Sequence, residues 1–226
     1  MINERKYKAL KLTGFILCAV GFVLLAVTMY FFRKNPPFID ASIRDFFYNI
    51  RGSKYGIMYW IFSIVTEFGN FWVILFLLII VLYKTKGDFR FFLFLFGSML
   101  SVIIVVGMKD IYSRERPIEA LQWATEDSKS FPSGHSAVAG FTYTYFIYLI
   151  YHTDYSKIRK RIYFILLVLL IILVMISRLV LGVHYFTDVL AGCFSGIMVS
   201  CLCMLLFRYC LNNDILTNGI LKKKKE

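Results

Sequence analysis

Cysteine is scarce in this chain, and its few cysteines suit neither a metal site nor a disulfide framework. They lie within or at the ends of long apolar runs, at Cys18, Cys193, Cys201, Cys203 and Cys210. Their spacing is not that of metal ligands, and no loop between them is placed to be cross-linked. We therefore interpret them as small apolar packing residues.

The sequence also lacks any recognised nucleic-acid-binding module, although its formal net charge is +12. The cations are dispersed over short loops. No internal repeat, low-complexity segment or linker divides the chain. We therefore expect one domain over residues 1–226 with no nucleic-acid partner, and we attribute most of the charge to membrane topology and anionic lipid.

Apolar residues, in contrast, are abundant. They make up 59% of the 226 residues, and the mean hydropathy is +0.67, which is too high for a water-soluble globule of this size. Because a spanning helix needs about 20 mainly apolar residues, we predict an all-α polytopic integral membrane protein with six transmembrane helices. The six apolar runs, extended through flanking residues where short, are Leu12–Phe32, Phe71–Tyr83, Phe91–Met108, Ala137–Tyr151, Ile162–Ile176 and Val189–Phe207.

Two features at the ends of the first two runs bear on the topology, namely the residues after the first run and the polar residues before the second. No small-residue cleavage site follows the first run, so we expect it to remain as an anchor and not to act as a signal peptide. Glu67 and Asn70 interrupt the wider run Trp60–Tyr83, and we place both near the outer interface.

The basic residues predict an orientation. They precede the first run, join the second to the third and the fourth to the fifth, and follow the sixth. Six spans bring these loops and both termini to one side, which the positive-inside rule makes cytoplasmic. Residues 35–56, 110–132 and 179–185 then face outward. The basic tail, residues 212–226, is interpreted as a solvated cytoplasmic segment, and attraction to anionic lipid is the alternative.

Residues 33–58 form an outer interfacial segment in this scheme. Pro36-Pro37 ends the first helix, and much of the apolar set of Phe38–Tyr59 falls on one helical face. Two structures fit this pattern equally well, a helix lying in the outer interface and an ordinary packed extracellular helix.

Three groups of polar residues stand at the outer ends of apolar runs. In the first group, Lys109 ends the third run, and Arg116-Pro117 follows seven residues later. Both cations can point at one anion from the edge of the membrane. Taken alone, the pair would more simply be interfacial side chains that extend toward water.

The second group, Pro132-Ser133-Gly134-His135, begins the fourth run. An uncapped helix N-terminus with a serine hydroxyl, and with a glycine that allows close backbone approach, can bind a phosphate. His135 lies in the first turn, opposite two cations, where it can act as an acid or a base. A lone histidine there would more often be a satisfied interfacial residue.

The third group comprises Arg178 at the end of the fifth run and His184 and Asp188 at the start of the sixth. An i, i+4 spacing stacks His184 and Asp188 on one helical face. A carboxylate bonded to one ring nitrogen raises the basicity of the other, as a nucleophilic histidine requires. A pair that merely stabilises the loop is the alternative, but it does not account for three converging cations. The three groups together suit phosphoester cleavage through a phosphorylated histidine.

The motifs Lys109-x6-Arg116-Pro117, Pro132-Ser133-Gly134-His135 and Ser177-Arg178-x5-His184-x3-Asp188 resemble the three-part signature of the type 2 phosphatidic acid phosphatase (PAP2) superfamily, which includes vanadium haloperoxidases. The residues around the first two motifs are similar to small bacterial phosphatidylglycerophosphatase B-like enzymes. This resemblance implies a PAP2/haloperoxidase-like helical core, catalytic motifs within residues 109–188, and the plasma membrane of a bacterium.

The resemblance also implies a role for each residue. His184 would attack phosphorus, Asp188 would orient it, and His135 would protonate the leaving oxygen and then activate water. The implied phosphate-binding residues are Lys109, Arg116, Ser133, Gly134 and Arg178. No metal or other cofactor is expected, because the protein itself supplies the positive charge.

The expected substrate is a membrane lipid phosphate such as phosphatidylglycerophosphate, phosphatidic acid or undecaprenyl diphosphate. An acyl or prenyl chain can stay in the outer leaflet while its phosphate reaches His184. Two alternatives are a catalytically silent lipid-binding relative and a lipid transporter that uses the cations as a headgroup site. A silent relative would be expected to lose part of the motif, and transport would survive loss of His184.

Overall fold

The computed structural model describes residues 4–118 and 122–212, with side chains for 12–118 and 122–210. Within these ranges the chain forms helices and no strands, so the all-α prediction is confirmed for this part. The helices are α1 (Glu4–Phe32), α2 (Phe38–Ile50), α3 (Ile57–Glu67), α4 (Phe71–Thr85), α5 (Phe89–Tyr112), α6 (Gly134–Tyr151), α7 (Lys157–Val180) and α8 (Phe186–Asn212).

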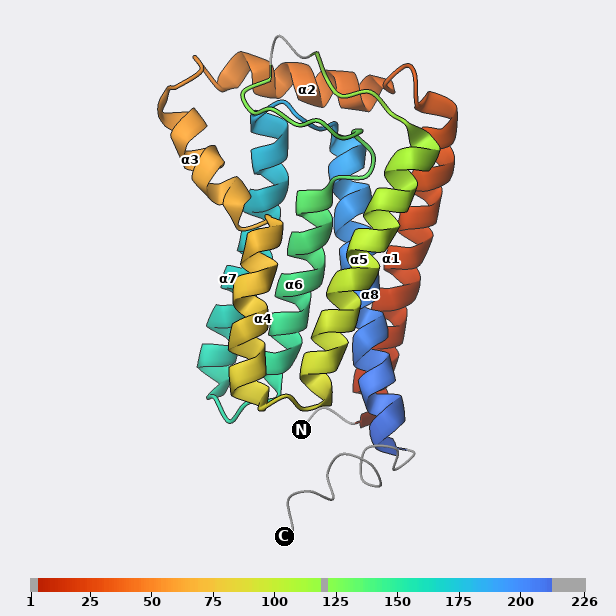
Figure 1. Cartoon of the computed structure of the whole chain (residues 1–226), viewed down its shortest axis with the longest axis vertical. Helices are drawn as coiled ribbons and strands as arrows, with labels where there is room; N and C mark the ends of the chain where they lie inside the picture. The colour runs from red at the N-terminus through yellow and green to blue at the C-terminus, as the bar shows by residue number, and fades with distance from the viewer. Residues whose placement is uncertain (1–3, 119–121, 213–226) are drawn as a thin grey trace.

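The long helices stand side by side as a bundle, and α2 lies across its upper end (Figure 1). The described parts of the α5–α6 loop and the short α7–α8 connection lie at this same end. Helix α1 begins and α8 ends at the opposite end, where the α4–α5 and α6–α7 loops also lie. The predicted catalytic motifs and the predicted basic loops therefore occupy opposite ends of the bundle.

Four of the described helices, α1, α5, α7 and α8, are long and apolar enough to cross a membrane. Helices α3 and α4 meet at a 45° bend and add a fifth span if they count as one. The prediction of six spans is not confirmed by these criteria, because α6 is not among the qualifying helices. Helix α6 carries polar residues such as Ser136 and Thr142, and it lies inside the bundle against α5, α7 and α8.

Small residues allow α6 and α8 to approach closely. A Cβ atom at Gly192 would collide with the carbonyl oxygen of Ser133, and one at Gly196 would collide with that of Ala137. The two helices start at the same end of the bundle, where the Ser133 amide donates to the Asp188 carbonyl oxygen at 3.0 Å. Backbone packing thus brings the second and third predicted motifs together.

The helix expected within Phe38–Tyr59 is confirmed over Phe38–Ile50. Phe47 packs toward Val180, Leu181 and Val183, whereas Phe38 is 87% exposed. The helix also buries a charged residue completely, because Asp40 is 0% exposed. Helix α2 is therefore anchored to the bundle by polar as well as apolar contacts.

Candidate active site

The predicted site residues converge at the end of the bundle that α2 covers. Lys109 lies in the last turn of α5, and Arg178 lies in the last turn of α7. His135 lies in the first turn of α6, and Asp188 lies in the first turn of α8. His184 comes two residues before α8 begins. The site is thus built from four helix ends and the loops between them.

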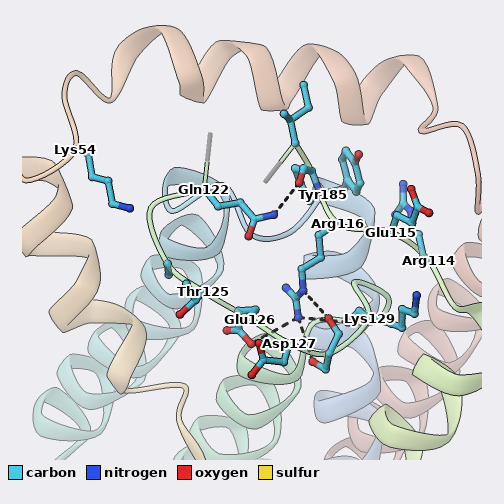
Figure 2. A pocket seen from close by; sticks show the side chains of 14 residues that line it. Lys54, Arg114, Glu115, Arg116, Gln122, Thr125, Glu126, Asp127, Lys129 and Tyr185 are labelled. Carbon is cyan, nitrogen blue, oxygen red and sulfur yellow. Dashed lines mark hydrogen bonds and ion pairs between the residues drawn. The ribbon is translucent and has the colours of Figure 1, made fainter. Parts of the chain in front are cut away.

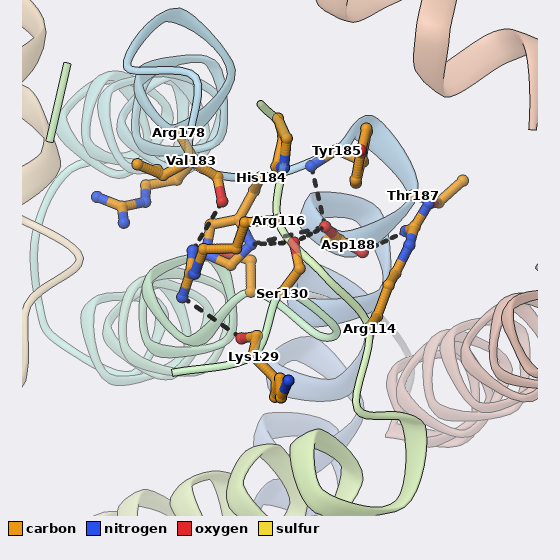
Figure 3. A network of polar contacts seen from close by, with 12 residues as sticks. Arg114, Arg116, Lys129, Ser130, Arg178, Val183, His184, Tyr185, Thr187 and Asp188 are labelled. Atoms are coloured by element: carbon orange, nitrogen blue, oxygen red, sulfur yellow. Dashed lines mark hydrogen bonds and ion pairs between the residues drawn. The ribbon is translucent and has the colours of Figure 1, made fainter. Parts of the chain in front are cut away.

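His184 is buried beside Arg116 (Figure 3). The Arg116 Nη1 atom donates to the Val183 carbonyl oxygen at 2.7 Å and lies 3.2 Å from His184 Nε2. A guanidinium can only donate, so Nε2 is the acceptor and a neutral ring carries its proton on Nδ1. Burial, together with the positive charges of Arg116 and Arg178, holds the pKa of His184 well below its usual range. The ring is therefore neutral at pH 7, and Nε2, which accepts from Arg116 in this structure, is the nitrogen with the lone pair that a nucleophile needs.

The expected hydrogen bond between His184 and Asp188 is not present. His184 Nδ1 and Asp188 Oδ2 are 3.7 Å apart, because His184 precedes α8 and is not part of its first turn. The Ser130 hydroxyl bridges the pair: it donates to Asp188 Oδ2 at 2.6 Å and lies 3.5 Å from His184 Nδ1. The Tyr185 amide also donates to Asp188 Oδ2, at 2.9 Å. The carboxylate is thus oriented toward the imidazole through Ser130.

Two predicted phosphate-binding arginines hold a carboxylate between them. Arg178 Nη2 pairs with Glu126 Oε1, and Arg116 Nη2 lies 3.6 Å from Glu126 Oε2. Burial alone would raise the pKa of Glu126, but Arg178 and Arg116 hold it below its usual range. Arg178 also donates to Thr66 Oγ1 at 2.7 Å, while its buried Nε has no hydrogen-bond partner among the described residues. The arginines are therefore arranged to bind an anion.

Lys109 and Arg116 are joined by the loop segment that both bind. Lys109 Nζ donates to Ser128 Oγ at 2.7 Å and to the Lys129 carbonyl oxygen at 2.6 Å. Arg116 Nε donates to the Ser128 carbonyl oxygen at 2.7 Å. The predicted convergence of these two cations is thus observed, with the loop as their shared acceptor.

The prediction of an uncapped α6 N-terminus is wrong. Ser133 is fully buried, and its Oγ accepts from the Ser136 amide at 3.5 Å and from Ser136 Oγ at 3.1 Å. The Ser133 hydroxyl therefore acts as the helix cap. Gly134 follows in α6, and His135 lies against Gly69, where an added Cβ atom would come within 3.0 Å of the His135 Cβ. His135 is thus beside the break between α3 and α4.

A polar cavity of about 970 Å³ opens beside Arg116 on the α2 side of the bundle (Figure 2). Glu126, Lys129, Gln122 and Tyr185 are among the residues that line it. Within the described parts of the chain, no group of three or more histidine, cysteine, aspartate or glutamate side chains is placed to hold a metal ion. The cavity therefore reaches Arg116 and Glu126, whereas Arg178 and His184 are not among its lining residues.

Sequence reasoning did not identify several residues that complete the site. Ser130 and Arg114 stand next to predicted motifs, so their positions in the sequence offered a signal. Asp40 and Thr66 are far from those motifs along the chain, whereas Glu126 lies between the first two motifs without belonging to either. Only the packing of α2, of α3 and of the α5–α6 loop brings these three side chains to the site.

Known proteins resemble this chain in sequence and in fold. Residues 90–211 match the family model described as the PAP2 superfamily. Over 120 residues the chain is 34% identical to phosphatidylglycerophosphatase B of Bacillus subtilis (strain 168). That alignment covers 52% of this chain and 57% of the relative, so it spans little more than half of the relative's length.

Two crystal structures resemble the bundle. The first transmembrane PAP2 type phosphatidylglycerolphosphate phosphatase from Bacillus subtilis superimposes with a TM-score of 0.73 and 25% identity, over 86% of this chain and 96% of that one. Aquifex aeolicus LpxE has a TM-score of 0.60 and 22% identity, over 73% and 94% of the two chains, which is a likeness of fold.

Proposed function

Because the chain belongs to the PAP2 superfamily, we propose that it is a metal-independent membrane lipid phosphatase that acts through a phosphohistidine. One observation carries the proposal, the environment of His184. The buried imidazole has its Nε2 beside Arg116 and its Nδ1 facing Ser130 and Asp188. This is the arrangement that activates a nucleophilic histidine next to an anion site.

The geometry supports a two-step reaction. His184 Nε2 attacks phosphorus, an N–P bond forms, and the P–O bond to the lipid breaks while His135 gives its proton to the leaving oxygen. Ser130 and Asp188 stabilise the positive charge that develops on the His184 ring. Water then attacks the phosphohistidine, His135 accepts its proton, and the N–P bond breaks to release inorganic phosphate.

Cationic groups neutralise the oxygens of the transferred phosphate in both steps. Arg116 and Arg178 already hold the carboxylate of Glu126, and Lys109 of α5 binds Ser128 of the same α5–α6 loop. The Gly134 amide adds a neutral donor at the start of α6, next to the capping residue Ser133. Fixed charges aimed at a transferring phosphoryl group commonly supply a large part of the stabilisation of the transition state.

The proposed substrate is a lipid phosphate monoester or diphosphate, namely phosphatidylglycerophosphate, undecaprenyl diphosphate or phosphatidic acid. The phosphatidylglycerophosphatase names of the relatives support a lipid phosphate. We further propose six spans with α6 as the enclosed sixth, the catalytic end on the extracytoplasmic side of a bacterial plasma membrane, and both termini in the cytoplasm. Residues 33–58 would then lie at the outer interface. The tail from residue 213 onward lies outside the described residues.

The test is release of inorganic phosphate from a panel of lipid phosphates by the purified protein in excess EDTA. We expect turnover by the wild type, none by His184→Ala, and about 10²–10⁴-fold less by His135→Ala, which is the usual contribution of positioned acid–base catalysis. His152→Gln, at the opposite end of α6, is the matched control and should retain activity. Near-normal release by a folded His184→Ala protein would refute the mechanism. Lipid movement without hydrolysis would favour transport.

A further inference from the structure

Behind Asp188 lies a buried ionic network that the proposed mechanism does not yet use. Arg114 is 1% exposed, and Asp40 and Asp188 are both 0% exposed. Arg114 Nη1 pairs with Asp188 Oδ1, and Arg114 Nη2 pairs with Asp40 Oδ2 at 2.7 Å. The arginine therefore links α2 to the first turn of α8.

Thr187 closes this network. Its hydroxyl lies 2.7 Å from Asp40 Oδ2 and 2.9 Å from Arg114 Nη1, and its amide donates to Asp40 Oδ1 at 2.9 Å. The Arg114 guanidinium also stacks on the Tyr185 ring, 4.4 Å from its centroid. Partners on both edges and on one face fix the guanidinium, so Asp188 Oδ1 is held in one position.

The charges of this network are unequal. One buried arginine faces two buried carboxylates, and a buried carboxylate remains ionised only where charge and hydrogen bonds compensate for the loss of water. Asp40 also receives the Thr187 amide, and Asp188 receives the Tyr185 amide and the Ser130 hydroxyl. Arg114 is the single cation that the described structure places against both carboxylates.

We propose that Arg114 is a positioning residue that keeps Asp188 ionised and fixed behind Ser130, so that Asp188 can stabilise the charge on His184, and that Asp40 orients Arg114. This inference rests on the proposed function, because it assigns the two residues a task in that reaction. It makes α2 part of the catalytic apparatus through Asp40. Neither residue touches the phosphate, so both act through Asp188.

The proposal predicts that removing Arg114 changes the protonation state of the network, in addition to removing its hydrogen bonds. Two carboxylates would then share one buried site without a counter-ion, and one of them would take up a proton at neutral pH. A protonated Asp188 cannot stabilise the imidazolium. Removing Asp40 as well would leave Asp188 as the only carboxylate in the network, so it could ionise again. If Arg114 and Asp40 had a merely structural role, the opposite would hold: replacing Asp40 as well would lower kcat further than replacing Arg114 alone.

The charged and titratable groups around His184 come from every neighbouring element. They are Lys109 of α5, His135 of α6, Arg178 of α7, Asp188 of α8, and Arg116 and Glu126 of the α5–α6 loop. None of these groups changes in the variants below. A change in the pH dependence of kcat or of the Tm therefore reports on the Arg114 network.

The experiment compares Arg114→Gln, Asp40→Asn and the double variant in the full-length protein purified in detergent. For Arg114→Gln we expect kcat to fall about 10–100-fold, a loss typical of removing an outer hydrogen-bonding partner, with KM nearly unchanged and with partial recovery as pH rises. Asp40→Asn should lose much less. The double variant should exceed Arg114→Gln in kcat. A double variant that is no better than Arg114→Gln would overturn the proposal.

Thermal unfolding between pH 5 and 8 tests the same network without any turnover. In Arg114→Gln a proton taken up by the buried carboxylate pair on folding has to be lost as pH rises, which leaves two buried charges without a counter-ion, so the Tm should fall as pH rises. The double variant should lose this slope. If the slope appears but the wild type hydrolyses no lipid phosphate, the proposed function fails and the ionic network stands. If Arg114→Gln has the wild-type slope, the charge argument fails.

Three further variants separate the effect of the Arg114 charge from misfolding and from the general loss of a charged residue. Arg114→Lys keeps the charge but loses the two-armed geometry, so it should lower kcat without the pH slope in Tm, and it can be measured if Arg114→Gln does not fold. Asp45→Asn removes an exposed carboxylate from α2, the helix that carries Asp40. Arg90→Gln removes an arginine that pairs with Asp88 at the start of α5, at the end of the bundle opposite the site. Both controls should retain the wild-type kcat and pH profile.

Discussion

Ser130 supplies the hydroxyl that bridges His184 and Asp188, so its removal should lower kcat. In Ser130→Ala the carboxylate keeps Arg114 and the Tyr185 amide but loses its 2.6 Å hydrogen bond and its connection to the imidazole. A hydrogen bond to a charged group contributes about 1.5–3 kcal/mol. We expect kcat to fall roughly 10–100-fold, with little change in KM.

The matched control for Ser130→Ala is Ser98→Ala. Ser98 is also buried, but its hydroxyl bonds to the Phe94 carbonyl oxygen within α5, away from the site. Steady-state kinetics of the two variants on the same lipid phosphate should differ by the factor assigned to Ser130. Equal activities would show that the bridge has no catalytic part.

Glu126 occupies the space between the two anion-binding arginines, so an incoming phosphate has to displace it. Its lowered pKa keeps it ionised at pH 7. Glu126→Gln removes this competing charge, and we expect vanadate to inhibit the variant at roughly tenfold lower concentration, which corresponds to about 1.4 kcal/mol. Glu115→Gln, an exposed carboxylate of the same loop, should bind vanadate as the wild type does.

The same residue has a predictable pH dependence. Because its folded-state pKa lies below the unfolded value of about 4.3, the ion pairs of Glu126 stabilise the fold above that value and are lost as pH falls through the folded-state pKa. The advantage of Glu126→Gln in vanadate binding should therefore shrink in strongly acidic buffer. An advantage that grew with acidity would contradict this role.

The motif residues were predictable because their spacing and chemistry are visible along the chain. Lys109, Arg116, Arg178, His184 and Asp188 are indeed brought together. The detailed contacts were not predictable. The Ser130 bridge depends on the α5–α6 loop reaching under His184, and no periodicity reveals that path.

At the level of elements, the long apolar runs predicted α1, α5, α7 and α8 well, because a helix facing lipid has to be apolar along its whole length. Helix α6 carries a weaker signal, since its neighbours in the bundle satisfy its polar groups. Tyr143 is an example, because its hydroxyl donates to the Phe68 carbonyl oxygen at 2.6 Å. The break between α3 and α4 falls between Glu67 and Phe71, where Glu67 and Asn70 interrupt the apolar run in the sequence, but the 45° bend itself was not predictable from that pattern.

The close contact of α6 and α8 gives a prediction at this scale. In Gly196→Ala the added methyl group meets the α6 backbone at Ala137 and Phe141, so the helices have to separate. Overpacking of this kind costs about 1–3 kcal/mol, and we expect a lower Tm in detergent together with reduced activity. Gly107→Ala, where α5 leaves open space, should be neutral or slightly stabilising. Equal effects at the two positions would refute close packing as the reason for Gly196.

At the scale of the whole molecule, the distribution of charge separates the two ends of the bundle. Basic residues beside the α4–α5 and α6–α7 loops, such as Lys84 in the last turn of α4 and Lys160 near the start of α7, lie at the end opposite α2. At the α2 end the site cations Arg114, Arg178 and Lys109 bind carboxylates and carbonyl oxygens of the site itself. The loop cations can therefore obey the positive-inside rule while the site cations serve phosphate binding.

This separation predicts which end faces the cell exterior. Cysteine replacements at Ser53, near α2, and at Asp154, in the α6–α7 loop, both place a thiol at an exposed position. In a background with the five native cysteines replaced, a membrane-impermeant thiol reagent applied to intact cells should label Ser53→Cys at once. It should label Asp154→Cys only after permeabilisation, because the basic loops fix that end in the cytoplasm. The reverse pattern would place the catalytic end in the cytoplasm, and the substrate would then have to come from the inner leaflet.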